Sequence, residues 1–142
     1  MNHPQLVVFE SDGWLAEQVR GLAQENRWLL REPRQTEACL DLVRETRASL
    51  LLLKLQRGLI NEFRLLALLR ERVPDCPVVV CSDLKLESVA QRTTLAALAY
   101  DLGARYVMFP PLTQNLLEDV VSGLMAATIA RLNRVKGSPN HA

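Results

Sequence analysis

The sequence predicts a doubly wound α/β sandwich, in which helices cover both faces of a parallel sheet. Five apolar segments with the length of strands alternate with five segments of helical periodicity, and short connections join them. Residues 49–55 are apolar at almost every position, which is typical of a strand buried on both faces of a sheet. The expected strands span residues 6–10, 28–31, 50–54, 78–82 and 106–109.

The first three helices are predicted between these strands, and apolar residues recur at helical spacing in two of them. The residues are Leu15, Val19 and Leu22 in the first helix, and Leu66, Leu69 and Val73 in the third. A weaker second helix covers residues 36–44. Each of these segments lies between two expected strands, as the alternating architecture requires.

The fourth and fifth helices are expected to be longer. Residues 87–102 are rich in Ala and Leu, and Gly103 follows them where a helix C-cap glycine belongs. The fifth helix runs from Thr113, an expected N-cap, to about Arg134. With roughly 22 residues it would be about 33 Å long, whereas a typical strand spans about 17–20 Å. Its far end is therefore expected to overhang the sheet.

The fifth helix carries more apolar residues than one face of a small sheet requires. A core-facing stripe is expected from Leu116, Leu117, Val120, Val121 and Leu124. Met125, Ile129 and Leu132 continue on an arc that is rotated away from Leu116 and Val120. Two interpretations remain open at this point: the stripe drifts within an intramolecular core, or the far end is a surface for self-association or a partner.

Composition limits the classes of protein to consider. The chain has 142 residues, of which 49% are hydrophobic, and we expect one domain over residues 1–135 with a disordered tail over residues 136–142. The formal net charge is +1, so no global field favours nucleic acid or an anionic membrane. No secretory signal or membrane span is evident, and we expect a cytoplasmic protein.

Cysteine and histidine give no pattern of metal ligands. The three cysteines, Cys39, Cys76 and Cys81, lie in or beside apolar segments without a C-x-x-C pair, and His3 and His141 lie at opposite ends of the chain. We expect the thiols to be reduced and to serve packing. No metal and no cofactor is predicted.

Lys54 is the first charged residue at the carboxyl end of the expected third strand. In open α/β sheets, ligands bind and chemistry occurs just beyond the carboxyl ends of the strands. An amine at that place cannot act as a carboxylate nucleophile, and its positive charge repels a metal cation. Lys54 therefore favours a binding module over an enzyme.

Over residues 5 to about 133, the chain resembles the receiver domains of bacterial response regulators. The resemblance implies a flavodoxin-like sandwich with a five-stranded parallel sheet and five helices. An acidic cluster follows the first strand, and a helix follows the third strand at receiver-like spacing. The segments that carry the resemblance are residues 6–12, 50–55, 62–70, 77–82 and 103–110.

The resemblance also implies a phosphorylation pocket, and in this sequence that pocket is degenerate. Receivers accept a phosphoryl group on an aspartate at the end of the third strand, where this chain has Lys54. They bind Mg²⁺ through two acidic residues after the first strand; Glu10 matches the first, Ser11 stands at the second, and Asp12 lies one step beyond. The nucleophile is absent and one metal ligand is weakened.

Two further positions of the pocket can be compared with the family. Receivers have a hydroxyl residue at the end of the fourth strand, which Ser82 matches. A lysine before a proline ends their fifth strand, and here Phe109 precedes Pro110. Phe109 could fill the pocket and lock one conformation, or it could belong only to the core. The resemblance thus implies a pseudo-receiver that does not transfer phosphate.

The charges of this pocket suggest a substitute for the metal. We hypothesise that the Lys54 ammonium pairs with Glu10, with Asp12 or with both, because both acids follow a strand expected beside the third. If such a pair is buried, removing one partner destabilises the fold by leaving the other charge uncompensated. The alternative is that Lys54 extends to solvent and that each group is hydrated on its own.

The predicted function is a regulatory protein-interaction module in bacterial signalling that works without phosphorylation. By resemblance, the contact surface is the face formed by the fourth helix, fifth strand and fifth helix, through which a protein partner or a second copy would bind. Phe109 belongs to the apolar set that supports this surface. The other residues expected there are Leu98, Tyr106, Met125, Ile129 and Leu132.

A second function from a different class stays open on the sequence alone. The same crevice could bind a small anion as a sensor, or act as a weak enzyme, with Lys54, Glu10, Asp12 and Ser82 as polar groups. Glu10 and Asp12 have no histidine or nucleophile beside them, which disfavours acid–base catalysis. A DNA-binding regulator is disfavoured because the sequence shows no output domain and no basic patch.

Overall fold

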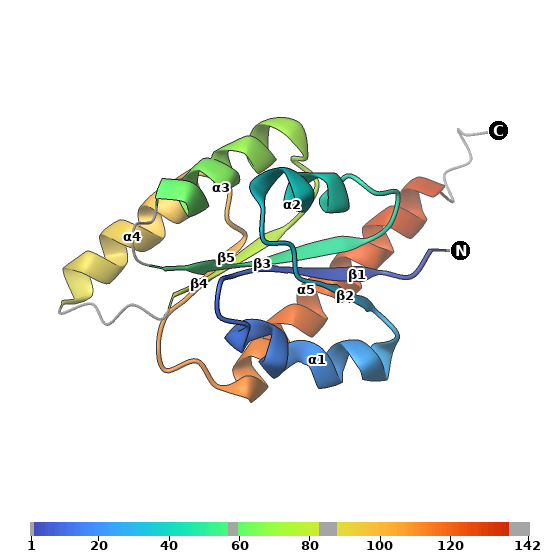
Figure 1. Ribbon diagram of the computed structural model, residues 1–142, viewed down its shortest axis with the longest axis horizontal. Helices are drawn as coiled ribbons and strands as arrows, with labels where there is room; N and C mark the ends of the chain where they lie inside the picture. The colour runs from blue at the N-terminus through green and yellow to red at the C-terminus, as the bar shows by residue number, and fades with distance from the viewer. Residues whose placement is uncertain (1, 57–59, 83–87, 137–142) are drawn as a thin grey trace.

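The computed structural model describes residues 2–56, 60–82 and 88–136, which form three layers, with a sheet between two layers of helices (Figure 1). Within these residues the sheet has five strands in the order β2-β1-β3-β4-β5, and every neighbouring pair is parallel. The predicted doubly wound α/β class is confirmed. The strands are β1 (Gln5–Phe9), β2 (Leu29–Arg31), β3 (Ser49–Leu55), β4 (Val78–Ser82) and β5 (Tyr106–Met108).

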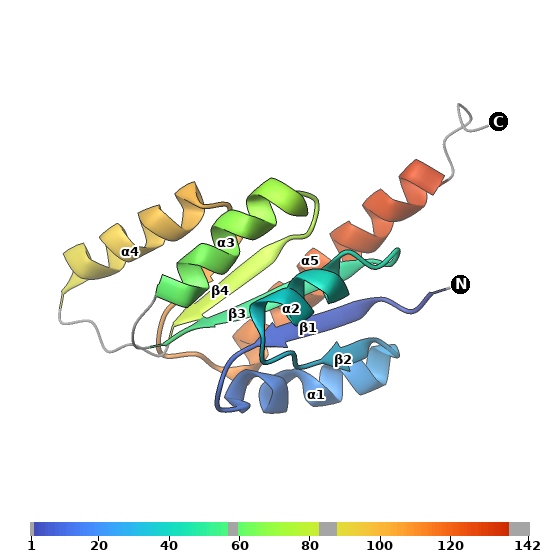
Figure 2. The ribbon, with the colours of Figure 1, turned by 45° about the horizontal axis from the view of Figure 1, so that its top comes forward.

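The helices divide between the two faces of the sheet. Helices α1 and α5 cover one face, and α2, α3 and α4 cover the other (Figures 1 and 2). Their bounds are α1 (Trp14–Asn26), α2 (Thr36–Val43), α3 (Ile60–Arg72), α4 (Val89–Asp101) and α5 (Gln114–Lys136). None of the helices in the described part of the chain is both long enough and apolar enough to cross a membrane.

Strand β3 is the centre of the core, and all seven of its residues are buried. Successive side chains of a strand point to opposite faces. Leu50 and Leu52 accordingly pack in the core on the α1–α5 face, whereas Leu51 and Leu53 pack in the core under α2 and α3. The continuous apolar run therefore serves two cores at once, which is why it shows no alternation in sequence.

The structure contains both of the predicted helix caps, Thr113 before α5 and Gly103 after α4. Thr113 Oγ1 accepts a hydrogen bond from the Leu116 N–H at 3.2 Å and caps α5. Gly103 has φ 108°, which suits the left-handed turn after α4. Helix α4 begins at Val89 with Ser88 as its N-cap, and Glu87, the predicted first residue, lies outside the described residues.

Several predicted boundaries differ from the structure. β2 begins at Leu29, because Trp28 still belongs to the turn that ends α1, where its N–H donates to Ala23 O at 2.9 Å. β3 continues one residue past Lys54, to Leu55. Lys136, which the sequence predicts in the tail, is the last residue of α5, and residues 137–142 lie outside the described part.

For α5, burial supports the first of the two interpretations, in which the apolar stripe drifts within the intramolecular core. Leu117, Val121 and Met125 are fully buried and form one stripe, and Ile129 and Leu132 pack partly buried against the same core. These residues follow one another at intervals of three or four, which keeps them on one side of a helix. The prediction is wrong for Leu116, which is an exposed side chain, because it lies on the side of the helix opposite to Met125.

Candidate functional site

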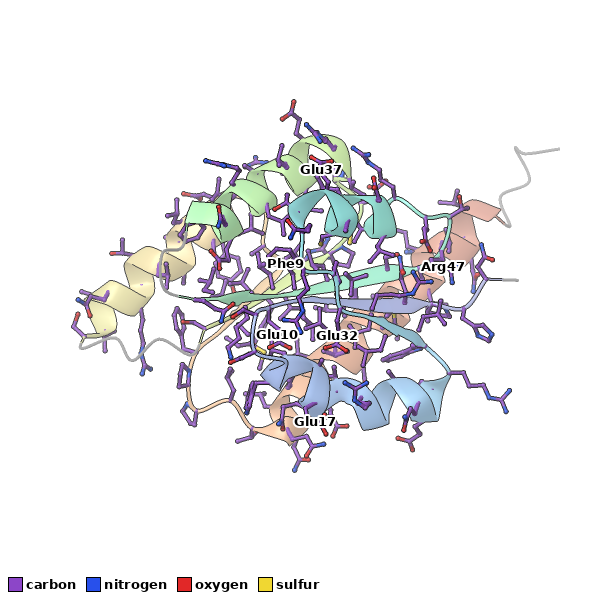
Figure 3. The ribbon with its side chains drawn as sticks, viewed as in Figure 1. Phe9, Glu10, Glu17, Glu32, Glu37 and Arg47 are labelled. Atoms are coloured by element: carbon purple, nitrogen blue, oxygen red, sulfur yellow. The ribbon has the colours of Figure 1, made fainter. Side chains whose placement is uncertain are left out.

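The candidate site lies where the carboxyl ends of β1, β3 and β4 meet. Lys54 of β3 is paired in register with Cys81 of β4, and Phe9 at the end of β1 is paired with Leu53. Glu10, the next residue after Phe9, therefore lies beside Lys54, the next residue after Leu53. Figure 3 shows Glu10 on the α1 side of the sheet and Phe9 on the opposite side, as strand alternation requires.

Lys54 forms a close ion pair with Asp12 across this edge of the sheet. Its ammonium nitrogen lies 2.7 Å from Asp12 Oδ2, and the ring of Trp14 is 5.6 Å from the same nitrogen. The lysine side chain is only 4% exposed, whereas the aspartate side chain is 49% exposed. The hydrogen bond from Lys54 lowers the pKa of Asp12 below its ordinary value. The carboxylate is thus held in its charged form beside a buried cation.

Glu10 binds the start of helix α1. Its two carboxylate oxygens accept the N–H groups of Leu15 and Ala16, each at 2.8 Å. Asp12 Oδ1 accepts the N–H of Trp14 at 3.2 Å, so these two acids satisfy the first three amides of α1. Burial raises the pKa of Glu10 above its ordinary value, although the two backbone hydrogen bonds oppose that rise. The acidic cluster caps a helix.

Ser11 is held by two residues that sequence reasoning missed. Gln56 Nε2 donates to Ser11 Oγ at 2.6 Å, and the Ser11 N–H donates to Gln56 Oε1 at 3.0 Å. Arg34 donates to the carbonyl oxygens of Glu10 and Ser11 at 3.0 and 2.7 Å. Both residues follow the ends of strands β3 and β2, and that position is the signal that could have identified them.

The other two predicted pocket residues, Ser82 and Phe109, are both separated from the Lys54 side of the sheet. Ser82 is fully buried at the end of β4, and its register partner is Leu55. Strand alternation gives Leu55 and Ser82 the α2–α3 face, whereas Lys54 and Cys81 belong to the α1–α5 face. Phe109 is half-buried, with the guanidinium carbon of Arg92 5.9 Å from its ring. The phenyl ring therefore contacts α4.

These residues do not form a site for the Mg²⁺ that the fold family implies. Glu10 accepts two backbone amides, Ser11 binds Gln56, and Asp12 faces an ammonium group at 2.7 Å. Mg²⁺ requires several oxygen ligands in octahedral geometry. The Lys54 ammonium, 2.7 Å from Asp12, would repel a metal ion bound to that carboxylate. Within residues 2–56, 60–82 and 88–136 no cluster of three His, Cys, Asp or Glu side chains could hold a metal.

The cysteines lie in or beside the cores. Cys39 and Cys81 are buried, and Cys76 is half-buried. Burial raises the pKa of each thiol to about 12. Thiols with such a pKa remain protonated at neutral pH and are poor nucleophiles.

The predicted interaction residues divide into exposed and buried ones. Leu98 on α4 and Tyr106 on β5 are 44% and 43% exposed. Met125 is fully buried, and Ile129 and Leu132 are partly buried in the α1–α5 core, because they continue the stripe of α5 that faces the sheet. Met125 is therefore corrected from a surface residue to a core residue.

Solved structures share this architecture with the chain. A CheY-like response regulator receiver domain protein from Methanospirillum hungatei matches at 10% identity and a TM-score of 0.69, covering 89% of this chain and 97% of that one. The signal receiver domain of a putative Luxo repressor protein from Vibrio parahaemolyticus matches at 13% identity and a TM-score of 0.71, covering 96% and 99%. The receiver domain of NtrX from Brucella abortus matches at 18% identity and a TM-score of 0.66, covering 86% and 98%.

Sequence comparisons add no closer relative. No protein-family model matches the chain, and no curated protein matches it. At 10 to 18% identity the structural matches show the fold, and the chain has the fold of CheY-like receiver domains.

Proposed function

We propose that this protein is a receiver-like regulatory module that is held in one conformation without phosphorylation and acts by binding another protein chain. The Lys54–Asp12 ion pair carries the proposal, since a buried ammonium occupies the place where receivers accept a phosphoryl group. The module has no enzymatic role in this proposal. It would work in bacterial signalling in the cytoplasm, where its three cysteines would remain reduced.

The chemistry of the site supports independence from phosphate. Phosphoryl transfer to a protein requires an oxygen nucleophile and a metal or fixed cations that compensate the charge of the phosphate. Near the end of β3 this chain has the ammonium nitrogen of Lys54 in place of an oxygen nucleophile, and Asp12 already forms an ion pair with it. The β1–α1 connection is also fixed by Gln56 and Arg34. In this proposal the Lys54–Asp12 ion pair and the hydrogen bonds of Gln56 and Arg34 fix the conformation that the phosphoryl group and the metal stabilise in a receiver.

Helix α4 and strand β5 provide the surface for a partner. Of the thirteen residues of α4, only Ala99 is buried, and Leu98 and Tyr100 are 44% and 46% exposed. Tyr106 on the adjacent strand adds a third large side chain at 43% exposure. Exposed aromatic and apolar side chains are typical of protein interfaces. Tyr100 reaches β5, where its hydroxyl accepts the Val107 N–H at 3.2 Å, whereas Leu98 lies on the other flank of α4. This group of Leu98, Tyr100 and Tyr106 is the proposed contact.

Mass spectrometry tests the independence from phosphate. The protein is incubated with acetyl phosphate and Mg²⁺, and its intact mass is compared with that of an untreated sample. We expect no added phosphoryl group, while a receiver that retains its aspartate, treated in parallel, gains one. Stoichiometric phosphorylation of this chain would contradict the proposal.

Light scattering tests the contact surface, for the wild type and two variants. Leu98→Asp places a charge on the α4–β5 surface. Leu116→Asp is the matched control, because Leu116 is equally exposed at 45% but lies in the first turn of α5, where Gln114 donates to Gln18 O of α1. A dimer that is lost only in Leu98→Asp supports self-association. If all three proteins are monomers, we expect a foreign protein that binds the wild type and Leu116→Asp but not Leu98→Asp.

The alternative of ligand binding by Lys54 is not favoured by the geometry. The Lys54 side chain is 4% exposed, and its amine lies 2.7 Å from a carboxylate oxygen. An adjacent carboxylate stabilises the ammonium form, which opposes Schiff-base chemistry, and an incoming anion would have to displace Asp12.

A further inference from the structure

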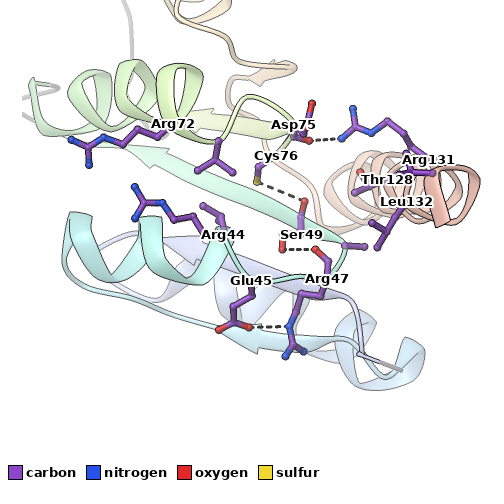
Figure 4. Close-up of a pocket in the computed structure, with 14 residues that line it drawn as sticks. Arg44, Glu45, Arg47, Ser49, Arg72, Asp75, Cys76, Thr128, Arg131 and Leu132 are labelled. Carbon is purple, nitrogen blue, oxygen red and sulfur yellow. Dashed lines mark hydrogen bonds and ion pairs between the residues drawn. The ribbon is translucent and has the colours of Figure 1, made fainter. Parts of the chain in front are cut away.

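A cavity lies at the end of the sheet opposite to Lys54. It has a volume of about 570 Å³ and is formed by the α2–β3 connection, the α3–β4 connection and the C-terminal half of α5 (Figure 4). Ligand sites for small molecules typically measure about 300–1,000 Å³. The two other cavities described in this structure have volumes of about 90 and 190 Å³, so this one alone among the three has room for a small organic ligand.

Arginine dominates the charge of the lining. Among the described residues that line the cavity there are four arginines, Arg44, Arg47, Arg72 and Arg131, against two acids, Glu45 and Asp75. The four come from the α2–β3 connection, the end of α3 and α5. A guanidinium stays protonated under all ordinary conditions and matches carboxylate and phosphate oxygens in pairs.

Two of these arginines already have firm partners within the protein. Arg47 Nε lies 2.9 Å from Glu45 Oε1, and its Nη1 donates to His3 O at 3.1 Å. Arg131 donates to the carbonyl oxygen of Asp75. The carbonyl ends of α2 and α3 also face this end of the sheet, and nearby cations offset their dipoles. Arg47 and Arg131 therefore stabilise this end of the fold through contacts within the protein.

Arg44 and Arg72 have only weak partners. Arg44 lies 3.6 Å from Asp41, and Arg72 lies 3.8 Å from Glu37, both measured between side-chain nitrogen and oxygen. The two carboxylates are 72% and 73% exposed, and surface pairs of this kind contribute little to stability. In Figure 4 the two arginine side chains extend in the same direction from α2 and α3, away from Cys76 and Leu132, so their guanidinium groups lie at the edge of the cavity. A ligand anion could exchange with these carboxylates at little cost.

The rest of the lining is largely apolar. Val43, Val73 and Leu132 belong to the cores or pack against them, and each also lines the cavity. Cys76 adds a thiol, which points to the Ser49 carbonyl oxygen at 3.7 Å. Pockets of this kind, apolar with a few charged groups, bind ligands that have an apolar body and a charged end.

We propose that this cavity binds a small organic oxyanion, with its phosphate or carboxylate between Arg44 and Arg72 and its apolar body against Val43, Val73 and Leu132. The site is separate from the Lys54 site and from the α4–β5 contact surface. It stands whether or not the proposed regulatory function is correct, because no residue is shared between them.

Nuclear magnetic resonance titration of the full chain with phenyl phosphate tests the site. We expect saturable amide shifts in residues 43–49, 72–76 and 128–135, and no comparable shifts at residues 10–15. Arg44→Gln and Arg72→Gln should each weaken binding about tenfold, as expected for the loss of one charge-assisted hydrogen bond. Arg64→Gln is the control, because Arg64 is exposed on the same helix as Arg72 but does not line the cavity.

Further probes separate the parts of the proposal. Benzoate in place of phenyl phosphate decides between a carboxylate and a phosphate, and binding of either one supports the site. Inorganic phosphate should bind at least tenfold more weakly than phenyl phosphate. Equal affinity would contradict the proposed contact between the ligand's apolar body and Val43, Val73 and Leu132. Equal weakening in Arg64→Gln, or no saturable shift with either organic anion up to about 10 mM, would overturn the site itself.

Discussion

Helices α1 and α4 have the same length, thirteen residues, but they bury very different surfaces. Helix α1 buries Leu15, Ala16, Val19, Leu22 and Ala23, whereas α4 buries only Ala99. Both lie in a layer against the sheet, so the difference does not follow from topology. It follows from side chains, because α1 presents a continuous apolar stripe and α4 mixes alanine with threonine, glutamine and arginine.

The strands repeat the contrast between the two regions. β3, in the middle of the sheet, has seven buried residues, and β5 at its edge has three residues, of which Met108 alone is buried. Regions with little buried apolar surface open locally at a lower free energy than the core. We infer that β1, β3 and α1 stabilise the fold, while α4 and β5 supply an adaptable surface.

The largest expected effect compares a leucine from each region. Leu52 of β3 is fully buried, and Leu98 of α4 is 44% exposed. Leu52→Ala should lower the free energy of unfolding by about 2–5 kcal/mol, since it removes buried methyl groups and leaves a cavity. Leu98→Ala should change it by less than about 0.5 kcal/mol. Urea unfolding of the isolated monomer measures both, and equal losses would show that α4 belongs to the same cooperative core.

The ion pair offers a second comparison, between its buried and its exposed partner. Asp12→Asn keeps an acceptor for the Trp14 N–H but removes the carboxylate nearest to a buried ammonium, and should lower the free energy of unfolding by about 2 kcal/mol. Lys54→Met should change it by less than about 1 kcal/mol, because methionine fills the same space and the half-exposed Asp12 can be hydrated.

Urea unfolding at neutral pH again provides the measurement for these two variants. A larger loss for Lys54→Met than for Asp12→Asn would show that the ammonium is needed in itself, for example through the Trp14 ring at 5.6 Å.

Acid should remove the difference between the wild type and Asp12→Asn. The folded-state pKa of Asp12 lies below its ordinary value of 3.8, so its stabilisation is present above that value and is lost as the pH falls through the lowered pKa. Glu10, whose folded-state pKa is raised above 4.5, acts in the opposite sense: its ionisation reduces stability as the pH rises through that range.

Asp12 also helps to raise the pKa of Glu10, through a side-chain hydrogen bond and through its charge, so the contribution of Glu10 cancels only in part between the two proteins. Its smaller penalty in Asp12→Asn acts against the gap at neutral pH. Unfolding measured from pH 7 down to about pH 2 should show a gap of about 2 kcal/mol that narrows below the ordinary aspartate range. A gap that stays constant with pH would mean that Asp12 stabilises the fold by packing or by its hydrogen bond to Trp14, and not by its charge.

The fold could be predicted because its signals are local. The run over residues 49–55 is apolar on both faces of one strand, Thr113 caps α5 and Gly103 follows α4 with positive φ. Each of these features depends on a few neighbouring residues. The stripe of α5 was predicted less well, because Leu116 and Leu117 are both apolar and only the packing against the sheet decides which one is buried.

The site was only partly predictable, because its contacts join residues that are far apart in sequence. Lys54 and Asp12 could be proposed as partners, since adjacent strands bring their ends together, and Glu10 remained an equal candidate. The structure shows both oxygens of Glu10 on the amides of Leu15 and Ala16. Arg34 and Gln56 act through long-range hydrogen bonds, for which a single sequence offers only their position after a strand.

The smallest expected effect tests whether α4 opens by itself. Ser88 Oγ accepts the Gln91 N–H at 3.2 Å, and Gln91 Oε1 accepts the Ser88 N–H at 3.3 Å, which forms a capping box at the start of α4. Ser88→Ala removes the first of these bonds and should weaken the helix locally by about 1 kcal/mol. Amide exchange should then become roughly fivefold faster across α4, while α1 and β3 exchange as in the wild type.

Global urea unfolding of Ser88→Ala should change by less than about 0.5 kcal/mol, because α4 would already be open before the core unfolds. Thr113→Ala is the matched control, since it removes the cap of α5, a helix that buries Leu117, Val121 and Met125 fully in the core. Loss of that cap should lower the global free energy of unfolding by about 1 kcal/mol. If Ser88→Ala lowers it by the same amount, α4 unfolds together with the core, and its exposed side chains belong to a rigid surface.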